Sequence, residues 1–334
     1  MNEEKIKICW GIKYRPELAG NAYGYRIHNE TLLKYVSQIA DICDEAKDIV
    51  LITSPEFYKN KIEEKRNWLF TMFEGNSLPD IYVESIKKAD FLLTPSTWVK
   101  QIFSKYFDSD KIFVVSHGVE PHFYYKERSV PTTRPFRFFY EGAANPRKGY
   151  EELIIAWKYG GFINDNRFQL YVKTTGIKNE GIIKNRNVII DGRNLERKEL
   201  VSLYHKAHCF ILPSRGEGFG LTLLQAMATG LPCIATNYSG ITDFFDETVG
   251  YPIGYKMGEG EVTFVGDKDF VKHKTEIAFP NVDELISQMV RIVSDYESAL
   301  KIGVLASIKA KFFTWNRSAK VLVNQIRREQ HGIY

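Results

Sequence analysis

The stretch CFILPSRGEGFGLTLLQAMATGLPCIAT, at residues 209–236, decides the fold. Cys209–Leu212 and Cys233–Thr236 are short apolar runs typical of buried strands. Between them, Leu221–Ala228 has the length and apolar character of a buried helix, and Gly230 marks its end. The stretch therefore predicts a strand, a helix and a second strand parallel to the first.

The same alternation continues along the chain. The other expected strands are Lys5–Ile12, Asp48–Thr53, Trp68–Phe73, Phe91–Thr94, Lys111–Val115, Phe136–Tyr140, Gln169–Lys173 and Val188–Asp191. The other expected helices are Tyr25–Ala46, Asp80–Lys88, Thr97–Tyr106, Tyr150–Tyr159, Arg197–His205, Val282–Lys311 and Phe313–Arg328. Lys126–Pro135 is charged, contains two prolines and is typical of a linker, whereas Gly254–Lys274 has no clear period and is expected to be an excursion or a flap. The pattern predicts two parallel α/β units, which bind ligands at the carboxyl ends of their strands.

Composition supports a folded protein of about two domains. The chain has 334 residues, of which 44% are apolar and 26% charged. Its net charge of +4 does not by itself indicate a nucleic-acid or membrane partner. Met1–Lys5 is acidic where a secretion signal is basic, so we expect a cytoplasmic protein. The four cysteines fit no zinc or C-x-x-C spacing and are expected to be buried, reduced thiols.

A candidate anion site follows the first strand of the opening stretch. Glu217-Gly218-Phe219-Gly220 joins that strand to the helix, where backbone N–H groups and the positive helix end favour an anion. Gln225 lies eight residues after Glu217, about 12 Å of helical rise, so the two side chains could touch opposite ends of an extended ligand. Alternatively, Glu217 is a solvated loop acid and Gln225 a polar residue on the helix flank.

A second loop of the same half is basic. Residues 141–149 read EGAANPRKG and place Arg147 and Lys148 just before a helix, where two cations suit a diphosphate. The alternative is a solvated surface pair. The loop lacks the Gly-Lys-Ser/Thr ending of a P-loop, and Gly216–Gly220 is not G-x-G-x-x-G, so a dinucleotide enzyme is a weak alternative.

Together these segments resemble retaining GT-B glycosyltransferases of family 4. Residues 214–236 are similar to the E-x7-E signature region of that family, and Asn145–Gly149 resembles its basic donor-phosphate loop. Further motifs in the family's order and spacing are Phe73-Glu74, Leu78-Pro79, Ala89-Asp90, Pro95-Ser96, His117–Glu120, Trp315 and Ala319. The resemblance runs from about Trp68 to the C-terminus.

The resemblance implies an α/β GT-B fold, in which two Rossmann-like parallel α/β domains face a cleft. It implies an acceptor-binding domain at 1–130, a donor-binding domain at 131–312 and a C-terminal helix at 313–334 that returns toward the first domain. The implied activity is a metal-independent, hexosyltransferase-like reaction (EC 2.4) that needs no cofactor. It moves a sugar, with retention, from a nucleotide diphosphate sugar to a hydroxyl acceptor such as a glycan, a lipid-linked or a small molecule. No nucleic-acid partner and at most peripheral membrane contact are implied.

The resemblance also implies roles for individual residues. Arg147 and Lys148 would stabilise the leaving diphosphate, and Glu217 would hold sugar hydroxyls and the developing positive anomeric carbon. Glu74 would orient or deprotonate the acceptor hydroxyl, unless it caps the following turn. The donor would be bound by Gly218, Phe219, Gly220, Leu221, Gln225, Gly20, Asn194 and Leu195, with Gln225 at the ribose and the last two at the base. Gly20 and Gly24 equally suit an ordinary loop, and His28 and His117 suit packing roles.

Two departures from the family pattern leave rival functions open. Gln225 stands where the second acid is expected, and Ala143 stands where the basic loop often has Arg. They motivate a sugar-nucleotide-binding protein without catalysis as one rival; an epimerase or a phosphorylase on the same fold is another. Metal-dependent transfer needs an Asp-x-Asp motif, but the matches at 108–110 and 267–269 lie in polar connections away from the basic loop, so no metal site is expected.

Overall fold

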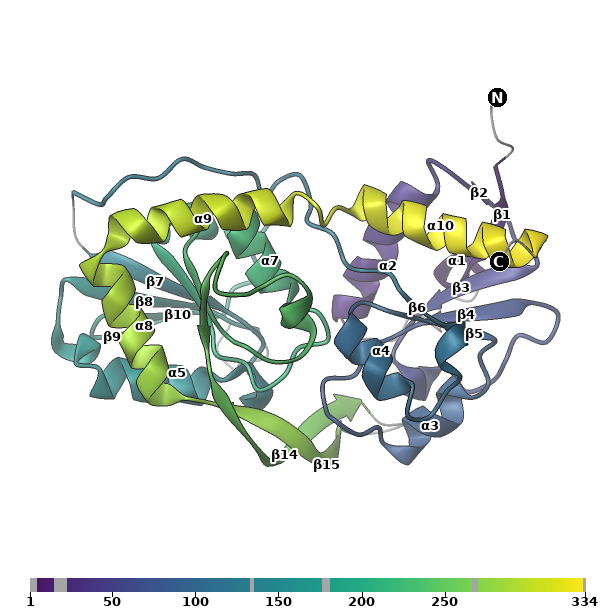
Figure 1. Ribbon diagram of the computed structural model, residues 1–334, viewed down its shortest axis with the longest axis horizontal. Helices are drawn as coiled ribbons and strands as arrows, with labels where there is room; N and C mark the ends of the chain where they lie inside the picture. Colours follow the sequence, from purple (N-terminus) through teal and green to yellow (C-terminus); the bar gives the residue numbers. More distant parts are fainter. Residues whose placement is uncertain (1–4, 15–22, 133–134, 176–180, 266–269, 333–334) are drawn as a thin grey trace. The chain divides into compact units, whose positions relative to one another are not determined.

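The computed structural model describes residues 5–14, 23–132, 135–175, 181–265 and 270–332. The chain forms two compact units (Figure 1). Unit 1 comprises Met1–Gly118, Glu261–Thr275 and Phe313–Tyr334, and unit 2 comprises Val119–Gly260 and Glu276–Phe312. Each unit is therefore assembled from segments that are distant in the sequence.

Unit 1 contains a parallel sheet of six strands in the order β2-β1-β3-β4-β5-β6. The strands are β1 (Lys7–Trp10), β2 (Asp41–Ile42), β3 (Asp48–Ile52), β4 (Arg66–Phe70), β5 (Phe91–Thr94) and β6 (Ile112–Val114). The α-helices are α1 (Gly11–Tyr14), α2 (Tyr23–Val36), α3 (Asp80–Ile86), α4 (Thr97–Phe103) and α10 (Trp315–His331). Helix α10 lies beside α2, and Leu322 and Ile326 of α10 are fully buried in the core of unit 1 (Figure 1). The C-terminal helix therefore returns to the first unit, as expected.

Unit 2 contains a sheet of seven strands in the order β13-β12-β11-β7-β8-β10-β9. The strands are β7 (Phe136–Glu141), β8 (Phe168–Lys173), β9 (Ile182–Asn185), β10 (Val188–Asp191), β11 (Cys209–Leu212), β12 (Cys233–Thr236) and β13 (Tyr251–Ile253). The helices are α5 (Tyr150–Tyr159), α6 (Arg197–Lys206), α7 (Leu221–Ala228), α8 (Val282–Ser294) and α9 (Tyr296–Ala310). All neighbouring strands are parallel except β9 and β10, so the loops after β7, β8, β10 and β11 meet at one edge of the sheet.

Several elements have the predicted bounds. They are β5, α5, β10, β11, α7 and β12. Most of the unit 2 elements among them are bounded by residues that interrupt helices or strands. For example, Gly149 adopts a φ of 70° before α5, and Gly220 a φ of 93° before α7. Strong end signals therefore explain the agreement.

Two predicted helices differ from the structure by more than a few residues at one end. The helix expected at Tyr25–Ala46 begins at Tyr23 and ends at Val36, because the chain turns and β2 pairs with β1. Gly24 consequently lies in α2 and not in the preceding loop. The helix expected at Val282–Lys311 is two helices, because Asp295 leaves helical geometry at φ −136° and its side chain accepts the N–H of Ser298 at 3.1 Å.

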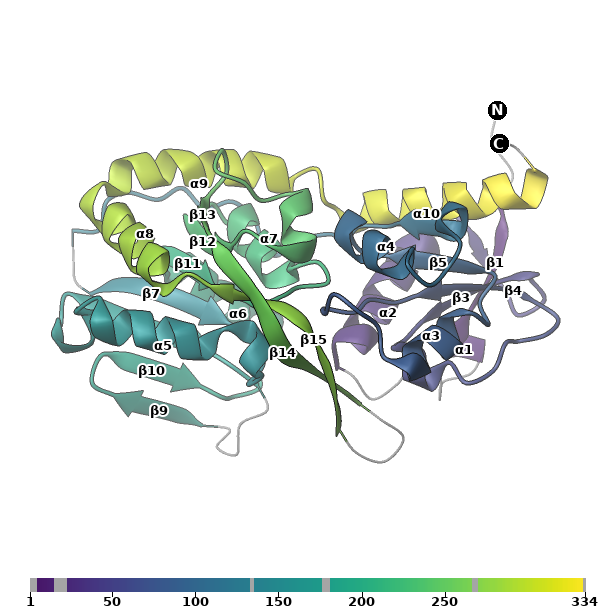
Figure 2. The ribbon, with the colours of Figure 1, turned by 60° about the horizontal axis from the view of Figure 1, so that its bottom comes forward.

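The segment expected to be an excursion is a β-hairpin formed by β14 (Tyr255–Val265) and β15 (Phe270–Pro280) (Figure 2). Three glycines, at 254, 258 and 260, interrupt the pattern around its first strand and hide the period of two. The middle of the hairpin, Glu261–Thr275, belongs to unit 1, whereas the predicted division at 131–312 placed it in the second domain.

The first boundary between the units also differs from the prediction. Residues 119–130 belong to unit 2 and not to a domain ending at 130. The N–H of Lys126 donates to the Thr229 oxygen at 3.3 Å, and the Arg128 guanidinium donates to the Ala207 oxygen at 2.7 Å. These hydrogen bonds attach the start of the predicted linker to unit 2.

All four cysteines are free thiols. Three are buried as expected, but Cys43, which follows the edge strand β2, is only half-buried. His28 and His117 are buried in unit 1 with ring centroids 4.3 Å apart, and both contact the Trp315 ring, in keeping with packing roles. Within the described ranges, the structure has no helix long and apolar enough to cross a membrane.

Candidate functional site

The basic loop of unit 2 is a short, fixed connection between β7 and α5. Asn145 accepts the N–H of Arg147 at 2.9 Å and caps a 3-10 turn at Pro146–Lys148. Gly149 follows with a φ of 70°, and a Cβ there would lie 1.7 Å from the Pro213 oxygen, so only glycine fits. The loop is therefore held against the chain that follows β11.

Both cations of this loop contact Glu217. The Lys148 ammonium donates to both carboxylate oxygens of Glu217, each at 2.8 Å. The Arg147 Nη1 lies 3.6 Å from Glu217 Oε2 and also donates to the Gly216 oxygen. The exposed fractions of the three side chains are 17% for Lys148, 10% for Arg147 and 7% for Glu217. The structure thus joins three predicted site residues in one buried ion cluster of unit 2.

The cluster sets the protonation state of Glu217. Burial alone raises the pKa of this carboxyl, but Lys148 and then Arg147 oppose burial, and the resulting pKa lies below its ordinary value. Glu217 is therefore ionised at neutral pH. Two cations against one carboxylate leave an excess positive charge that suits an anionic ligand.

The start of α7 lies directly beside this cluster. The Glu217 N–H donates to the Ser239 hydroxyl at 2.7 Å, and the Gly240 N–H donates to the Glu217 oxygen at 2.9 Å. Gly240 approaches so closely that a Cβ there would lie 2.3 Å from the Gly218 oxygen. Phe219 is buried, and Gly220 turns the chain into the helix. The predicted residues Gly218–Leu221 thus form a rigid entry to the positive end of α7.

Gln225 belongs to a buried polar cluster that the sequence did not indicate. Its Oε1 lies 3.4 Å from the Tyr204 hydroxyl, which also donates to the Glu141 carboxylate. Burial raises the pKa of Glu141, while the hydrogen bond from Tyr204 and the Lys173 charge oppose the rise. The Tyr204 hydroxyl therefore links a carboxylate, that of Glu141, to Gln225, which stands where the family pattern has its second acid. Glu141 is the last residue of β7, and this place at the end of a predicted strand could have identified it from the sequence.

Ala143 lines an apolar pocket of about 260 Å³ beside the basic loop. Val172 and Ile190, from β8 and β10, form part of its wall. The departure at position 143 therefore contributes an apolar surface where the family pattern often has a cation. Of the residues predicted at the nucleobase, Asn194 is exposed and Leu195 half-buried in the loop after β10. Gly20 lies outside the described residues.

Glu74 lies in unit 1, in the segment after β4. Glu56, which follows the neighbouring strand β3, is buried and accepts a hydrogen bond from Ser54. The Ser54 hydroxyl also lies 2.8 Å from the Tyr82 hydroxyl. Burial raises the pKa of Glu56 despite the bond from Ser54, and the Glu74 charge adds to the rise. Glu56 was missed, although its place just after a predicted strand was a usable signal.

The hairpin fixes the segment that carries Glu74. The Ser77 N–H donates to the Thr275 hydroxyl at 3.0 Å, and the Ser77 hydroxyl lies 3.2 Å from His273 Nε2. The His273 ring also contacts the Phe73 ring, at 5.9 Å between centroids. Residues on both sides of Glu74 are therefore held by β15.

The Asp-x-Asp motif at 108–110 caps a turn in the part of the chain that the structure describes. Asp108 accepts the N–H of Asp110 at 3.0 Å and caps a turn, and the motif at 267–269 lies outside the described residues. Among the side chains that the structure describes, no group of three or more His, Cys, Asp or Glu could hold a metal ion.

Residues 177–258, which contain Glu217 and Gln225, match the model of a family described as glycosyl transferases group 1. This part of the chain resembles the glycosyl transferases group 1. The match includes the Glu217 loop and α7, whereas the basic loop precedes it. The family resemblance predicted from the sequence is confirmed.

A curated relative is the D-inositol 3-phosphate glycosyltransferase of Paenarthrobacter aurescens (strain TC1). It is 24% identical over 245 residues, which cover 68% of this chain and 54% of that protein. The chain matches about half or less of the length of the first curated relatives.

Two solved structures show the fold. The Anabaena Alr3699/HepE structure, in complex with UDP and glucose, has a TM-score of 0.65 at 14% identity and covers 98% of this chain and 100% of that one. Sucrose-phosphate synthase from Thermosynechococcus elongatus has a TM-score of 0.64 at 15% identity, and the match covers 95% of this chain and 82% of that one. With the two parallel sheets, these similarities confirm the predicted GT-B fold.

Proposed function

We propose that the chain is a retaining glycosyltransferase that moves a sugar from a nucleotide diphosphate sugar to a hydroxyl acceptor without a bound metal. The observation that carries the proposal is the ion cluster of Lys148, Arg147 and Glu217 at the start of α7. The match of residues 177–258 to the glycosyl transferases group 1 and the name of the curated relative support the same class of reaction.

The cations act on the leaving group. When the bond between the anomeric carbon and the diphosphate oxygen breaks, its electron pair stays on that oxygen, so negative charge develops there. The Lys148 ammonium has three N–H donors, and two of them hold Glu217, so a third can bond a phosphate oxygen. Because Lys148, Arg147 and the first turn of α7 are already in place, they stabilise this charge without reorganising.

Glu217 acts on the sugar. As an ionised carboxylate it can accept hydrogen bonds from sugar hydroxyls and stabilise positive charge at the anomeric carbon. The acceptor oxygen then bonds to that carbon on the face that the diphosphate leaves, which retains the configuration. The acceptor hydroxyl loses its proton in this step, and Glu74 of unit 1 is the candidate to orient the hydroxyl or take the proton.

Gln225 and Glu141 act on the nucleotide. The Gln225 amide can bond a ribose hydroxyl, and Glu141, linked to it through Tyr204, adds the carboxylate that position 225 lacks. Asn194 and Leu195, after β10, are the proposed contacts of the nucleobase.

A hexose is the proposed sugar and a glycan the proposed acceptor. Four free cysteines support a reducing, cytoplasmic location.

Calorimetric titration with a panel of nucleoside diphosphates and their sugars tests the proposal, followed by product analysis with and without hydroxyl acceptors in excess EDTA. We expect one nucleotide to bind and its sugar to be transferred with retention. Arg147→Ala should weaken diphosphate binding, whereas the matched control Arg167→Ala, at an exposed site, should not. Binding without hydrolysis or transfer would instead indicate the non-catalytic binder, and an altered free sugar nucleotide would indicate an epimerase.

A further inference from the structure

Helix α9 of unit 2 buries small side chains and exposes large ones. Apart from Tyr296, its buried residues are Ala299, Gly303, Ala306, Ser307 and Ala310. Four large apolar side chains of α9 and the turn after it are exposed: Val304 by 39%, Leu305 by 50%, Ile308 by 48% and Phe312 by 59%. Helices that only pack against a core show the opposite arrangement. We call these four residues the α9 stripe.

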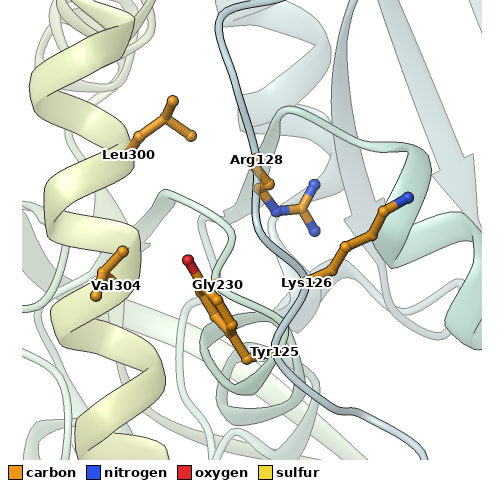
Figure 3. Close-up of a pocket in the computed structure, with 6 residues that line it drawn as sticks. All are labelled: Tyr125, Lys126, Arg128, Gly230, Leu300 and Val304. Carbon is orange, nitrogen blue, oxygen red and sulfur yellow. The ribbon is translucent and has the colours of Figure 1, made fainter.

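The α9 stripe is continuous. Its residues are spaced three or four apart, apart from the neighbours Val304 and Leu305, so they gather on one side of the helix. Tyr125, itself 39% exposed, lines a shallow pocket together with Val304, Leu300 and Lys126 (Figure 3). The apolar surface therefore extends from α9 onto the segment that contains Tyr125 and Lys126.

Three lysines accompany the stripe. Residues 298–312, which include most of α9 and the turn after it, contain Lys301, Lys309 and Lys311 and no Asp or Glu. Lys301 and Lys311, at the two ends of the stripe, are exposed, and Lys309 is half-buried. Basic side chains thus lie on the same helix and turn as the exposed apolar residues.

We propose that the α9 stripe docks on the surface of a lipid bilayer that contains anionic lipids. Large apolar side chains can enter the region between headgroups and acyl chains, while neighbouring lysines extend to the phosphates. A second copy of the chain is a poorer occupant, because lysines are depleted in protein interfaces and two such surfaces would repel each other. This docking does not depend on the proposed enzymatic activity.

Co-sedimentation of the full chain with vesicles tests the proposal. One set contains equal parts phosphatidylglycerol and phosphatidylcholine, and the other contains phosphatidylcholine alone. We expect binding to the mixed vesicles that weakens at high salt, and at least tenfold weaker binding to the neutral ones. Ile308→Gln/Phe312→Gln should lower binding by about tenfold or more, since two large apolar contacts are lost. Lys301→Glu/Lys311→Glu should lower it in the mixed vesicles only.

The matched control is Ile155→Gln/Tyr159→Gln on α5, where the two apolar side chains are exposed by 44% and 74%. It should bind like the wild type, and all variants should keep the wild-type melting temperature. The proposal is wrong if the full chain binds neither vesicle, or if the stripe variant and the control bind equally. It is also wrong if light scattering shows a dimer that the stripe variant abolishes, because a second copy then occupies the surface.

Discussion

Replacing Lys148 by Met should reverse the pH dependence that Glu217 gives to stability. In the native protein the Lys148 ammonium holds both oxygens of a carboxylate that is only 7% exposed. Removing one partner of a buried ion pair costs about 3 to 5 kcal/mol, and we expect the lower end because Arg147 remains 3.6 Å away. The free energy of unfolding at neutral pH should therefore fall by about 3 kcal/mol.

The direction in which stability changes with pH follows from the pKa of Glu217. In the native protein this pKa lies below its ordinary value of 4.5, so its contribution to stability is present above that pH and is lost as the pH falls through the folded pKa. Without Lys148, burial becomes the dominant influence and raises the pKa above 4.5. The variant should then lose stability as the pH rises through that raised pKa.

Urea unfolding of the native protein and of Lys148→Met at neutral pH and near the ordinary carboxyl pKa measures both effects. Lys158→Met, at an exposed lysine of α5, is the control for loss of a surface charge. Adding Glu217→Gln to Lys148→Met should restore part of the loss, since no buried charge then remains unpaired. An equal destabilisation at both pH values, or none beyond that of the control, would refute the buried ion pair.

Three further predictions concern the ribose contact of Gln225, the hydrogen bond from Tyr204 to Glu141, and transfer in the absence of a metal ion. Gln225→Leu should weaken donor binding by about 1 to 3 kcal/mol in calorimetry, because ribose hydroxyls lose their partner, and unchanged affinity would remove Gln225 from the site. Tyr204→Phe should lower the free energy of unfolding by about 1 to 3 kcal/mol at neutral pH, because the half-buried Glu141 carboxylate loses a donor; a neutral effect in urea unfolding would contradict that hydrogen bond. Transfer should persist in excess EDTA, and a complete loss that manganese restores would contradict a metal-independent reaction.

The sequence predicted elements well where strong end signals coincide with short apolar runs. Cys209–Leu212 and Cys233–Thr236 are buried throughout, and Leu221–Ala228 lies between glycines, so their bounds are confirmed. The hairpin could not be predicted in this way, because its strands are long and charged, the first strand contains two glycines, and the buried positions depend on contacts with residues distant in the sequence. Thr275, which contacts Ser77, is an example.

The candidate site was predicted in part for a similar reason. Arg147, Lys148 and Glu217 stand in motifs, and the structure brings them within hydrogen-bond or ion-pair distance of one another. Glu141 begins the basic-loop segment and Glu56 stands in no motif, and neither was given a role. Their surroundings depend on the distant residues Tyr204, which donates to Glu141, and Tyr82, which contacts Ser54 beside Glu56. A charged residue at or just after the end of a buried parallel strand is the sequence signal that would have added Glu141 and Glu56 to the candidate site residues.

The most direct test of the central claim is the turnover number for sugar transfer, measured with saturating donor and acceptor on Lys148→Ala, Glu217→Ala and the control Lys158→Ala. Deleting one preorganised charge stabiliser lowers turnover by about two to three orders of magnitude, so we expect this loss in the first two variants. Glu217→Ala should still bind the nucleoside diphosphate nearly as well as the native protein, because its partner is the sugar. Native turnover in Lys148→Ala and Glu217→Ala would contradict the assignment of the ion cluster as the donor site.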